Sequence, residues 1–459
     1  TWGLMLTGKV VGLKETESKS PSQAVNSLVN KLSEPVIRKA MHQAMKIMGH
    51  QFVLGRSISE AQKNGKKMRD KGYTYSFDML GEAALTDADA DKYFKDYIMA
   101  IEAVGRDGYG LDTSPAPSVS IKLSALHPRY EVANYERVMD EMYSTVLKLL
   151  EKARELDVAI TIDAEEADRL ELSLKLFEKL YRSESVKGWG KFGLVVQAYS
   201  KRALPVLVWL NGLAKDQGDL IPLRLVKGAY WDSEIKWSQQ GGYDNYPVYT
   251  RKEATDVAYL ACARFLLSAE VRGNIFPQFA SHNAHTVTAI AVMADHGDYE
   301  FQRLHGMGDA LYEHAMSAFG QSVRIYAPVG SHKDLLPYLV RRLLENGANS
   351  SFVHRLVDAR CPVDTLTHHP VDSLLAFETL NNIQIPLPGD IFDDRKNSIG
   401  VNVDIDSEAE VFEKAVHAFS DRQWKGAPII NGVNLFESMI KDGAQPTAVT
   451  APYDRTKHV

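Results

Sequence analysis

The chain has 459 residues, of which 45% are apolar and 24% charged, so it can bury a large core and is not disordered in bulk. Its net charge is −6 and no basic run stands out, which makes nucleic acid a poor candidate partner for this stretch. Two cysteines exclude a disulfide framework and a cysteine-rich zinc site, and no run reaches the roughly 18 apolar residues of a membrane helix.

The first segment, residues 1–72, is predicted to be a helical arm. Within residues 27–48 the apolar side chains recur at near-helical spacing, and Pro35 marks a break. This pattern indicates packing or dimer contact and carries no chemistry of its own. Because the chain starts at Thr1, we expect it to be a piece of a longer protein.

From Tyr73 onward, short apolar runs with strand character alternate with amphipathic helical segments. The eight runs are Tyr75–Leu80, Ser118–Leu123, Ala159–Ala164, Gly193–Ala198, Pro222–Lys227, Ile275–Ala280, Glu300–His305 and Val323–Ala327. The helical segments after them include residues 134–156, 167–181, 200–214, 253–268, 286–294 and 334–347.

Eight strand-then-helix units predict an α/β fold, a (βα)8 TIM-type barrel over residues 73–360. A doubly wound open sheet is the rival. It would place a glycine-rich phosphate loop after its first strand, and no such loop follows either of the first two runs.

The alternation of strand-like runs and helical segments ends at about residue 360. Residues 361–459 begin with several Pro, Asp and His residues and continue with a predicted helix, Ser407–Phe419, before the sequence WKGAPIING at Trp424–Gly432. We expect this stretch to be a tail packed on the barrel, followed by the start of another domain.

In a TIM barrel the active site forms where the strands end at their C-terminal face. Nearly every predicted strand here ends in a polar or ionisable residue, and eight such residues converging on one rim indicate a functional site. They are Glu82, Lys122, Asp163, Gln197, Lys227 with Tyr230, His282, His305 and Tyr326.

Two residues in the strands are unusual even singly. Lys122 ends an otherwise apolar run, where a lone ammonium group is costly to bury. Arg224 lies inside the sequence LRLV, on a strand that we expect to be covered on both faces. A buried arginine needs acceptors, and either a structural carboxylate or a bound ligand could supply them.

The last helical segment, 334–347, places four residues on one face at i, i+3, i+4 and i+7: Tyr338, Arg341, Arg342 and Glu345. Two adjacent guanidinium groups repel each other unless an anion lies between them. The aromatic neighbour and the missing glycine nest favour a carboxylate over a phosphate as that anion. The alternative is a solvated face on which Glu345 pairs with Arg341.

Two other motifs carry less weight. SHNAH at Ser281–His285 could supply two metal ligands, but no third ligand is evident at a suitable spacing. LHGMGD at Leu304–Asp309 lacks the third glycine of a dinucleotide fingerprint and is predicted to be a tight turn near the ligand. Nothing in the residue pattern itself identifies a flavin.

Several long, ordered stretches resemble the proline dehydrogenase domain of the bacterial bifunctional proline-utilisation (PutA) family. The resemblance runs over about residues 25–395, and its clearest segments are SIKLSALHPRY from Ser120, RLVKGAYWDSEIK from Arg224, PQFASHNAHT from Pro277, EFQRLHGMG from Glu300 and RIYAPVGSH from Arg324. It implies a distorted barrel that holds FAD noncovalently. It also implies oxidation of L-proline to Δ1-pyrroline-5-carboxylate, with the electrons passed to a membrane quinone.

The resemblance also implies residue roles. Arg341, Arg342 and Lys122 would bind the proline carboxylate, supported by Asp163, and Glu82 would close the site by pairing with Arg341. The ring of proline would be enclosed by Tyr230, Tyr326, Tyr338 and Leu304. FAD would be held by Gln197, Arg224, Lys227, Trp231, His282 and Glu345.

In this family an aldehyde dehydrogenase domain follows the barrel, and WKGAPIING resembles its opening. That chemistry needs a cysteine nucleophile, and no cysteine follows Cys361, so we expect the second activity to be absent from this chain. The DNA-binding segment that some members carry at the N-terminus is not recognisable here. The cysteine content and the quinone acceptor favour a cytoplasmic protein, peripheral on the inner membrane, and the oligomeric state stays open.

Two rival functions remain. One is a Schiff-base aldolase that uses Lys122 or Lys227, since lysines at strand ends suit that role in barrels. The other is a binding or scaffold module without catalysis. Borohydride trapping of a lysine would identify the first, and failure of proline to bleach a bound cofactor would favour the second.

Overall fold

The structure is a computed structural model that describes residue 49 and residues 51–108, 116–331, 338–342, 367–420, 422 and 424–458. The chain divides into two compact units after Ile399. The unit that contains the barrel therefore extends beyond residue 360, where the barrel domain was predicted to end.

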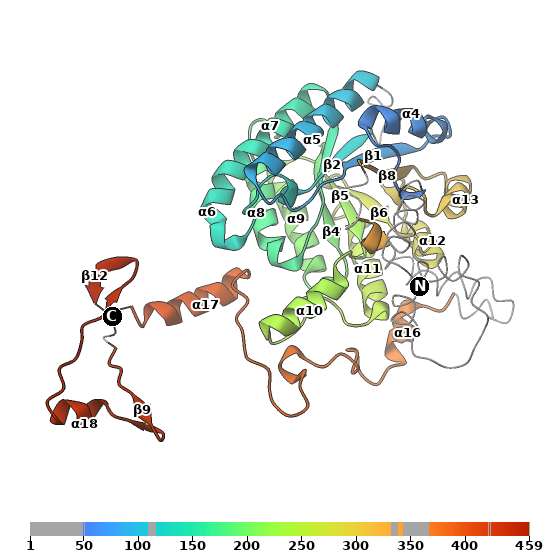
Figure 1. Ribbon diagram of the computed structural model, residues 1–459. Coiled ribbons are helices and arrows are strands. Elements are labelled where there is room, and N and C mark those ends of the chain that lie inside the picture. The colour runs from blue at the N-terminus through green and yellow to red at the C-terminus, as the bar shows by residue number, and fades with distance from the viewer. Residues whose placement is uncertain are drawn as a thin grey trace, which may run out of the picture. The chain divides into compact units, whose positions relative to one another are not determined.

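The first unit is built on a closed barrel of eight parallel strands in chain order, with the last strand pairing with the first (Figure 1). This confirms the predicted (βα)8 fold. The strands are β1 (Thr74–Met79), β2 (Ser118–Ile121), β3 (Ala159–Ile162), β4 (Phe192–Gln197), β5 (Ile221–Val226), β6 (Ile275–Ala280), β7 (Glu300–Leu304) and β8 (Val323–Val329).

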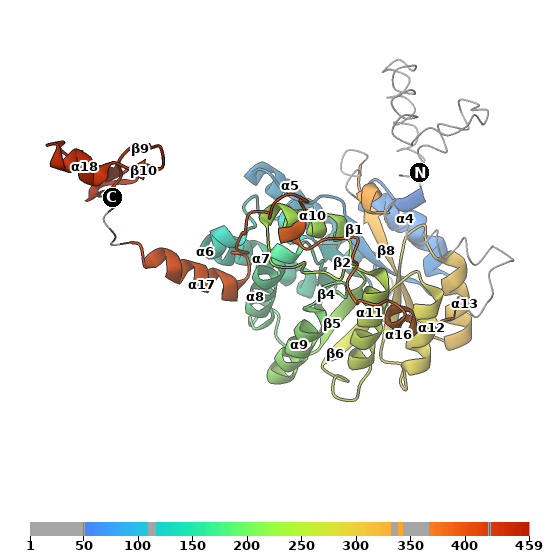
Figure 2. The ribbon, with the colours of Figure 1, turned by 90° about the horizontal axis from the view of Figure 1, so that it is seen from below.

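Helices surround the strands (Figure 2). They are α4 (Ile58–Arg69), α5 (Asp87–Asp107), α6 (Tyr135–Arg137), α7 (Tyr143–Glu155), α8 (Leu170–Tyr181), α9 (Ala203–Gln217), α10 (Trp231–Gly241), α11 (Lys252–Leu266), α12 (Ala284–Met293), α13 (Asp309–Phe319) and α16 (Pro370–Leu375). Residues 338–342 are also helical. A π-helical turn, Val138–Met142, joins α6 to α7, so the predicted helix 134–156 is present but not uniform.

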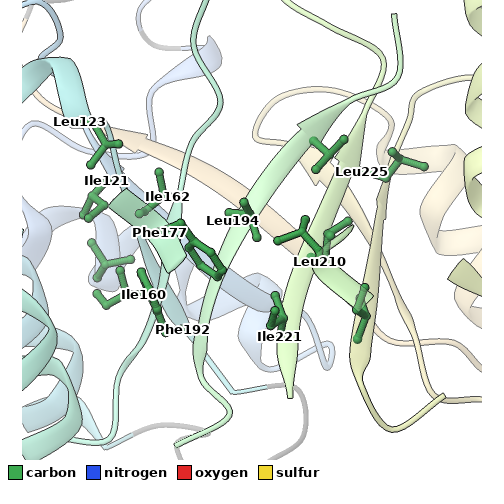
Figure 3. Close-up of a cluster of buried hydrophobic side chains, with 14 of the residues drawn as sticks. Ile121, Leu123, Ile160, Ile162, Phe177, Phe192, Leu194, Leu210, Ile221 and Leu225 are labelled. Atoms are coloured by element: carbon green, nitrogen blue, oxygen red, sulfur yellow. The ribbon is translucent and has the colours of Figure 1, made fainter. Parts of the chain in front are cut away.

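Side chains on the outer face of the barrel are branched and aromatic, and they pack against the helices. In Figure 3, Ile160, Leu194 and Ile221 come from neighbouring strands, and Phe177 projects from α8 among them. The rings of Phe177 and Phe192 stack with centroids 4.8 Å apart. Because side chains alternate along a strand, the intervening residues face the barrel interior, and many of those are polar.

Among the helices between the barrel strands, α5, α10 and α13 were not predicted from the sequence. Helix α5 carries a capping box in which Thr86 and Asp89 satisfy each other's backbone N–H groups, a signal that was available in the sequence. The predicted helical pattern at residues 27–48, with its break at Pro35, lies outside the described residues. Of the predicted arm, α4 is described, and it starts at a Ser57 cap.

Residues 367–399 cover the outside of the barrel near α10 and α11. Helix α16 packs on α11, the Tyr246 hydroxyl donates to the Pro386 carbonyl at 2.6 Å, and the Arg251 guanidinium lies 3.8 Å from the centre of the Phe377 ring. These contacts agree with the expected tail packed on the barrel.

The second unit, residues 400–459, contains α17 (Asp406–His417), the hairpin of β9 (Ile429–Ile430) and β10 (Val433–Asn434), α18 (Phe436–Lys441), and the pair β11 (Thr450–Ala451) and β12 (Asp454–His458). The helix predicted at Ser407–Phe419 is present as α17. In the described part of the whole chain, no helix combines the length and apolarity needed to cross a membrane.

Candidate active site

A cavity of about 560 Å³ opens at the C-terminal ends of the strands, a volume that suits a small-molecule ligand or cofactor. The strand-end and helix residues predicted from the sequence converge on it. Those that line it are Lys122, Asp163, Gln197, Arg224, Lys227, Tyr230, Trp231, His282, Leu304, Tyr326, Tyr338, Arg341 and Arg342.

Lys122 is buried at the base of the cavity between two carboxylates. Its Nζ donates to Asp78 Oδ1 at 2.7 Å and to Asp163 Oδ2 at 3.3 Å, and it lies 3.4 Å from the Tyr326 hydroxyl. The same Tyr326 hydroxyl donates to Asp163 Oδ2 at 2.6 Å. All these donors meet groups of the chain itself, so in this structure Lys122 orients its neighbours.

Charge balance keeps these groups ionised. Burial opposes a charged Lys122, but the carboxylate of Asp78, with Tyr326 and Asp163, outweighs burial and raises the pKa of Lys122 well above its usual range. Burial likewise favours a neutral Asp163, yet the charges of Lys122 and Arg224 hold the pKa of Asp163 below its usual value. The base of the cavity therefore carries a fixed ammonium and a fixed carboxylate.

Arg224 spans the inside of the barrel beneath Tyr326. Its Nη1 donates to Asp163 Oδ1 at 2.7 Å, its Nε donates to Gln302 Oε1 at 2.6 Å, and its guanidinium lies 5.0 Å from the centre of the Tyr326 ring. The acceptors that a buried arginine requires are therefore provided by the protein, and the guanidinium also lines the cavity.

Arg341 and Arg342 reach the cavity from the helical residues 338–342, and Leu339 packs behind them in an apolar cluster with Phe52 and Leu80. Arg341 makes a two-pronged pair with Glu82, with both N···O distances at 2.7 Å. The Arg342 guanidinium lies 5.1 Å from the centre of the Tyr338 ring. The described members of the predicted charged face, Tyr338, Arg341 and Arg342, therefore border the cavity.

The pair at the mouth is also electrostatically stable. Burial alone would raise the pKa of Glu82, but hydrogen bonds from Arg341 and its charge more than offset burial, so the pKa of Glu82 is lowered. The carboxylate thus stays ionised and bound to Arg341. An incoming anion would have to share or displace this contact.

A tight loop after β5 carries Tyr230 into the cavity. Gly228 adopts φ +148°, and a Cβ there would lie 2.4 Å from the Tyr199 ring, so a side chain would force the loop off Tyr199. Gln197 fixes the loop from β4 by accepting a hydrogen bond from the Ala229 amide at 3.1 Å. The loop packing places the Tyr230 ring 5.4 Å from the Arg341 guanidinium.

Cationic side chains line the part of the wall near α11. Lys227, Arg251 and Lys252 all border the cavity, and both lysines pair with Asp256. Tail residues hold Arg251 in place, because its Nε donates to the Asn381 carbonyl at 3.0 Å. Such a wall favours an anionic ligand.

Two predicted residues do not line the cavity. The first is Glu82, which reaches the rim of the cavity through its pair with Arg341. The second is His305, which is buried, and burial lowers its pKa to about 4, below the usual imidazole range. Glu345 lies outside the described residues. Asp78 was not predicted from the sequence, although its place at an alternate position of β1, two residues after Ser76, was a signal for an inward-facing side chain.

Both histidines of the SHNAH motif contact other groups of the protein. His282 accepts a hydrogen bond from the Leu304 amide at 3.1 Å, and His285 stacks edge-on with His369 at 6.3 Å between ring centres. Within the ranges that the structure describes, no group of three or more His, Cys, Asp or Glu side chains could hold a metal ion.

The family model described as "Proline dehydrogenase" matches residues 61–355, which cover the barrel. A second model, described as "DNA-binding domain of Proline dehydrogenase", matches residues 1–52. No DNA-binding segment was recognised there from the residues alone, so that interpretation and this description disagree. Nearly all of these residues lie outside the part of the chain that the structure describes.

Relatives and solved structures point the same way. The chain is 47% identical over 446 residues to the "Bifunctional protein PutA" of Salmonella typhimurium, covering 94% of this chain but only 34% of that protein. A solved structure of proline utilization A with proline bound in remote sites is 47% identical, with a TM-score of 0.76, and the match covers 88% of this chain and 41% of that one.

A more distant structure shares the same architecture. Proline utilization A from Bdellovibrio bacteriovorus, inactivated by N-propargylglycine, is 26% identical with a TM-score of 0.78, covering 96% of this chain and 46% of that one. The chain spans about a third of the length of the Salmonella protein.

Proposed function

The chain belongs to the proline dehydrogenase family, and from that premise we propose that its barrel oxidises L-proline to Δ1-pyrroline-5-carboxylate with FAD and passes the electrons to a membrane quinone. The observation that carries the proposal is the pair of guanidinium groups, Arg341 and Arg342, that line the cavity above the Lys122 and Asp163 cluster. Such a pair is suited to the carboxylate of a small amino acid.

The size and lining of the cavity support a flavin dinucleotide as the cofactor. Its volume of about 560 Å³ exceeds what proline alone needs, and aromatic and cationic walls lie in different parts of it. Tyr230, Tyr326 and Tyr338 offer flat apolar faces, and Lys227 and Arg251 offer donors for phosphates. In this proposal FAD is held by Gln197, Arg224, Lys227, Trp231 and His282, together with Glu345.

When bound, the flavin supplies the acceptor for the two electrons that leave proline. The protein supplies position and charge. Arg341 and Arg342 bind the carboxylate, and Lys122 holds Asp163 and Tyr326 in place at the base of the site. The rings of Tyr230, Tyr326 and Tyr338 enclose the pyrrolidine together with Leu304. Glu82 competes for Arg341, so the pair between them closes or opens the mouth.

Proline must react with a neutral amine, because removal of hydride beside an ammonium group is unfavourable. Lys122 cannot remove that proton, since it is held protonated with a raised pKa. We therefore expect the rate of flavin reduction to rise with pH as bound proline loses its proton. A flat profile in stopped-flow reduction would contradict this step.

The raised pKa of Lys122 also weakens the aldolase alternative. A Schiff-base lysine must be neutral to attack a carbonyl group, and Lys122 is buried against Asp78 and Asp163. Lys227 is similarly paired with Asp256. Both candidate lysines therefore already have a carboxylate partner.

The test is the visible spectrum of the purified full chain, recorded without oxygen before and after addition of L-proline. We expect a yellow protein whose oxidised-flavin absorbance disappears with proline and persists with pyrrolidine, which lacks the carboxylate. A colourless protein that traps a substrate on lysine with borohydride would instead support the aldolase. A coloured protein that proline leaves unchanged would overturn the proposed substrate.

A further inference from the structure

The inside of the barrel below the cavity holds a continuous line of polar side chains. Arg224 of β5 reaches across the barrel to Ser76 of β1 at 3.2 Å and to Ser120 of β2 at 3.0 Å. These strands are not neighbours of β5, so the bonded side chains must point into the barrel. TIM-barrel interiors are usually dominated by bulky branched residues, and a buried polar line of this kind calls for a reason.

The line runs from the floor of the barrel to the cavity. At the floor, Arg324 makes a two-pronged pair with Glu300, with N···O distances of 2.6 and 3.1 Å. Glu300 Oε1 also accepts from Gln302 Nε2 at 2.7 Å, and Gln302 Oε1 accepts from Arg224 Nε at 2.6 Å. Arg224 then donates to Asp163, and so ends the line at the cavity.

Within the described part of this line, Gln302 is the uncharged link between an anion, Glu300, and a cation, Arg224. A carboxylate only accepts hydrogen bonds and a guanidinium only donates them. The amide must therefore turn its nitrogen to Glu300 and its oxygen to Arg224. A glutamate at this position would set two carboxylates against each other. An aliphatic side chain would leave the buried Nε donor of Arg224 without this acceptor, while Glu300 Oε1 would keep its bond from Arg324.

We infer that Gln302 is a positioning residue for the reaction: Glu300 fixes its amide orientation, and the amide oxygen fixes the Arg224 guanidinium against Asp163 and the flavin. The inference rests on the proposed function, because it places Arg224 beside the bound cofactor. A guanidinium held there favours flavin reduction, since reduction adds electrons to the ring. Loss of the amide oxygen removes the acceptor of Arg224 Nε, so the guanidinium is held less firmly and stabilises the reduced flavin less.

Gln302→Met tests this assignment in the full chain, because it keeps the length of the side chain and removes both polar atoms. Anaerobic redox titration of the bound flavin should show its two-electron equilibrium shifted at least tenfold toward the oxidised form, about 30 mV. In steady state we expect kcat for proline to fall at least tenfold while KM changes less than threefold, because Arg341 and Arg342 are untouched.

Gln278→Met is the matched control. Gln278 is also buried, on β6 next to β7, and among the described residues its side-chain oxygen has no hydrogen-bond partner. The same loss of a buried amide there should leave the flavin equilibrium and the kcat within twofold of wild type. A shift as large as that of Gln302→Met would show a general packing effect and overturn the inference.

Gln302→Asn serves if Gln302→Met does not fold. It keeps an amide that is one methylene too short to reach both Glu300 and Arg224, and we expect a shift of at least threefold in the same direction. Unchanged flavin equilibria in both variants overturn the inference alone. Failure of both variants to fold would assign Gln302 a structural role and would also overturn the inference. If proline does not reduce the flavin of the wild-type protein, the proposed function is overturned, and this inference with it.

Discussion

Two bidentate arginine–carboxylate pairs occupy opposite ends of the barrel: the floor pair bonds through Nε and Nη2, and the mouth pair through Nη1 and Nη2. At the floor, Arg324 pairs with Glu300, and the two side chains are 3% and 0% exposed. At the mouth, Arg341 pairs with Glu82, and the exposed fractions are 14% and 24%. The floor pair has further protein partners, since Arg324 Nη1 donates to the Ala116 carbonyl at 2.6 Å and Gln302 donates to Glu300.

The two pairs also differ in burial, and burial determines whether solvent can replace a partner. The floor pair has no solvent to replace a missing partner, so it is a fixed part of the barrel. The mouth pair borders a cavity where water or an anion can replace Glu82, so exchange of partners costs little. One pair maintains the line of polar groups, and the other can open to a substrate carboxylate.

The largest expected effect separates these two ends directly. Glu300→Gln removes the buried anion and leaves the Arg324 charge uncompensated, so we expect the free energy of unfolding to fall by about 3–5 kcal/mol. Glu82→Gln should lower it by less than about 1 kcal/mol, because solvent reaches Arg341. Urea denaturation of both variants measures this contrast, and equal losses would erase the distinction between floor and mouth.

A third buried carboxylate sharpens the comparison because it has no arginine. Glu234 of α10 accepts from the Ala167 amide at 2.8 Å, and burial raises its pKa to about 7, with no cation of the described residues offsetting that burial. A carboxyl group whose pKa rises on folding stabilises the fold while it is protonated. For Glu234 this contribution is fully present below its ordinary pKa of 4.5, and it is lost as pH rises through its folded pKa of about 7.

Glu234→Gln stays neutral at every pH and keeps an oxygen for the Ala167 amide. Between pH 4.5 and 8, wild type should therefore lose on the order of 2 to 3 kcal/mol of unfolding free energy relative to this variant. Unfolding curves at several pH values measure the difference. Parallel curves for the two proteins would mean that Glu234 is ionised throughout that range.

The two arginines at the mouth, Arg341 and Arg342, should affect binding more than folding. In the proposed function, Arg341→Ala or Arg342→Ala would remove charged hydrogen bonds to the substrate carboxylate. Apparent proline affinity should then fall tenfold or more, about 1.5–3 kcal/mol for each charged hydrogen bond. Steady-state KM measures it. Arg272→Ala is the matched control, since Arg272 pairs with Asp295 on the surface, away from the cavity, and normal affinity in either mouth variant would remove that arginine from the site.

The barrel and its rim were predictable from the sequence because their signals are periodic. Strand residues alternate between faces, and a polar residue at each strand end falls on the same rim whatever the details of packing. The charged face of residues 338–342 followed from helical spacing in the same way.

What sequence could not supply was partnership across the barrel. Asp78, Glu300 and Gln302 are polar residues within strands, and nothing in the sequence identifies their partners. Closure of the barrel brings them to Lys122, Arg324 and Arg224, respectively. Lys122 illustrates the consequence. Its burial beside Asp163 was foreseen, but its main hydrogen bond goes to Asp78, a residue that no sequence pattern singled out.

The central claim is that the mouth guanidinium groups bind the carboxylate of the substrate, and substrate discrimination tests it most directly. L-prolinamide replaces that carboxylate with a neutral amide, so the ratio of kcat/KM for proline to that for prolinamide measures the charged contact. We expect a large ratio in wild type that falls at least tenfold in Arg341→Met and Arg342→Met. A ratio that neither substitution changes would contradict the account.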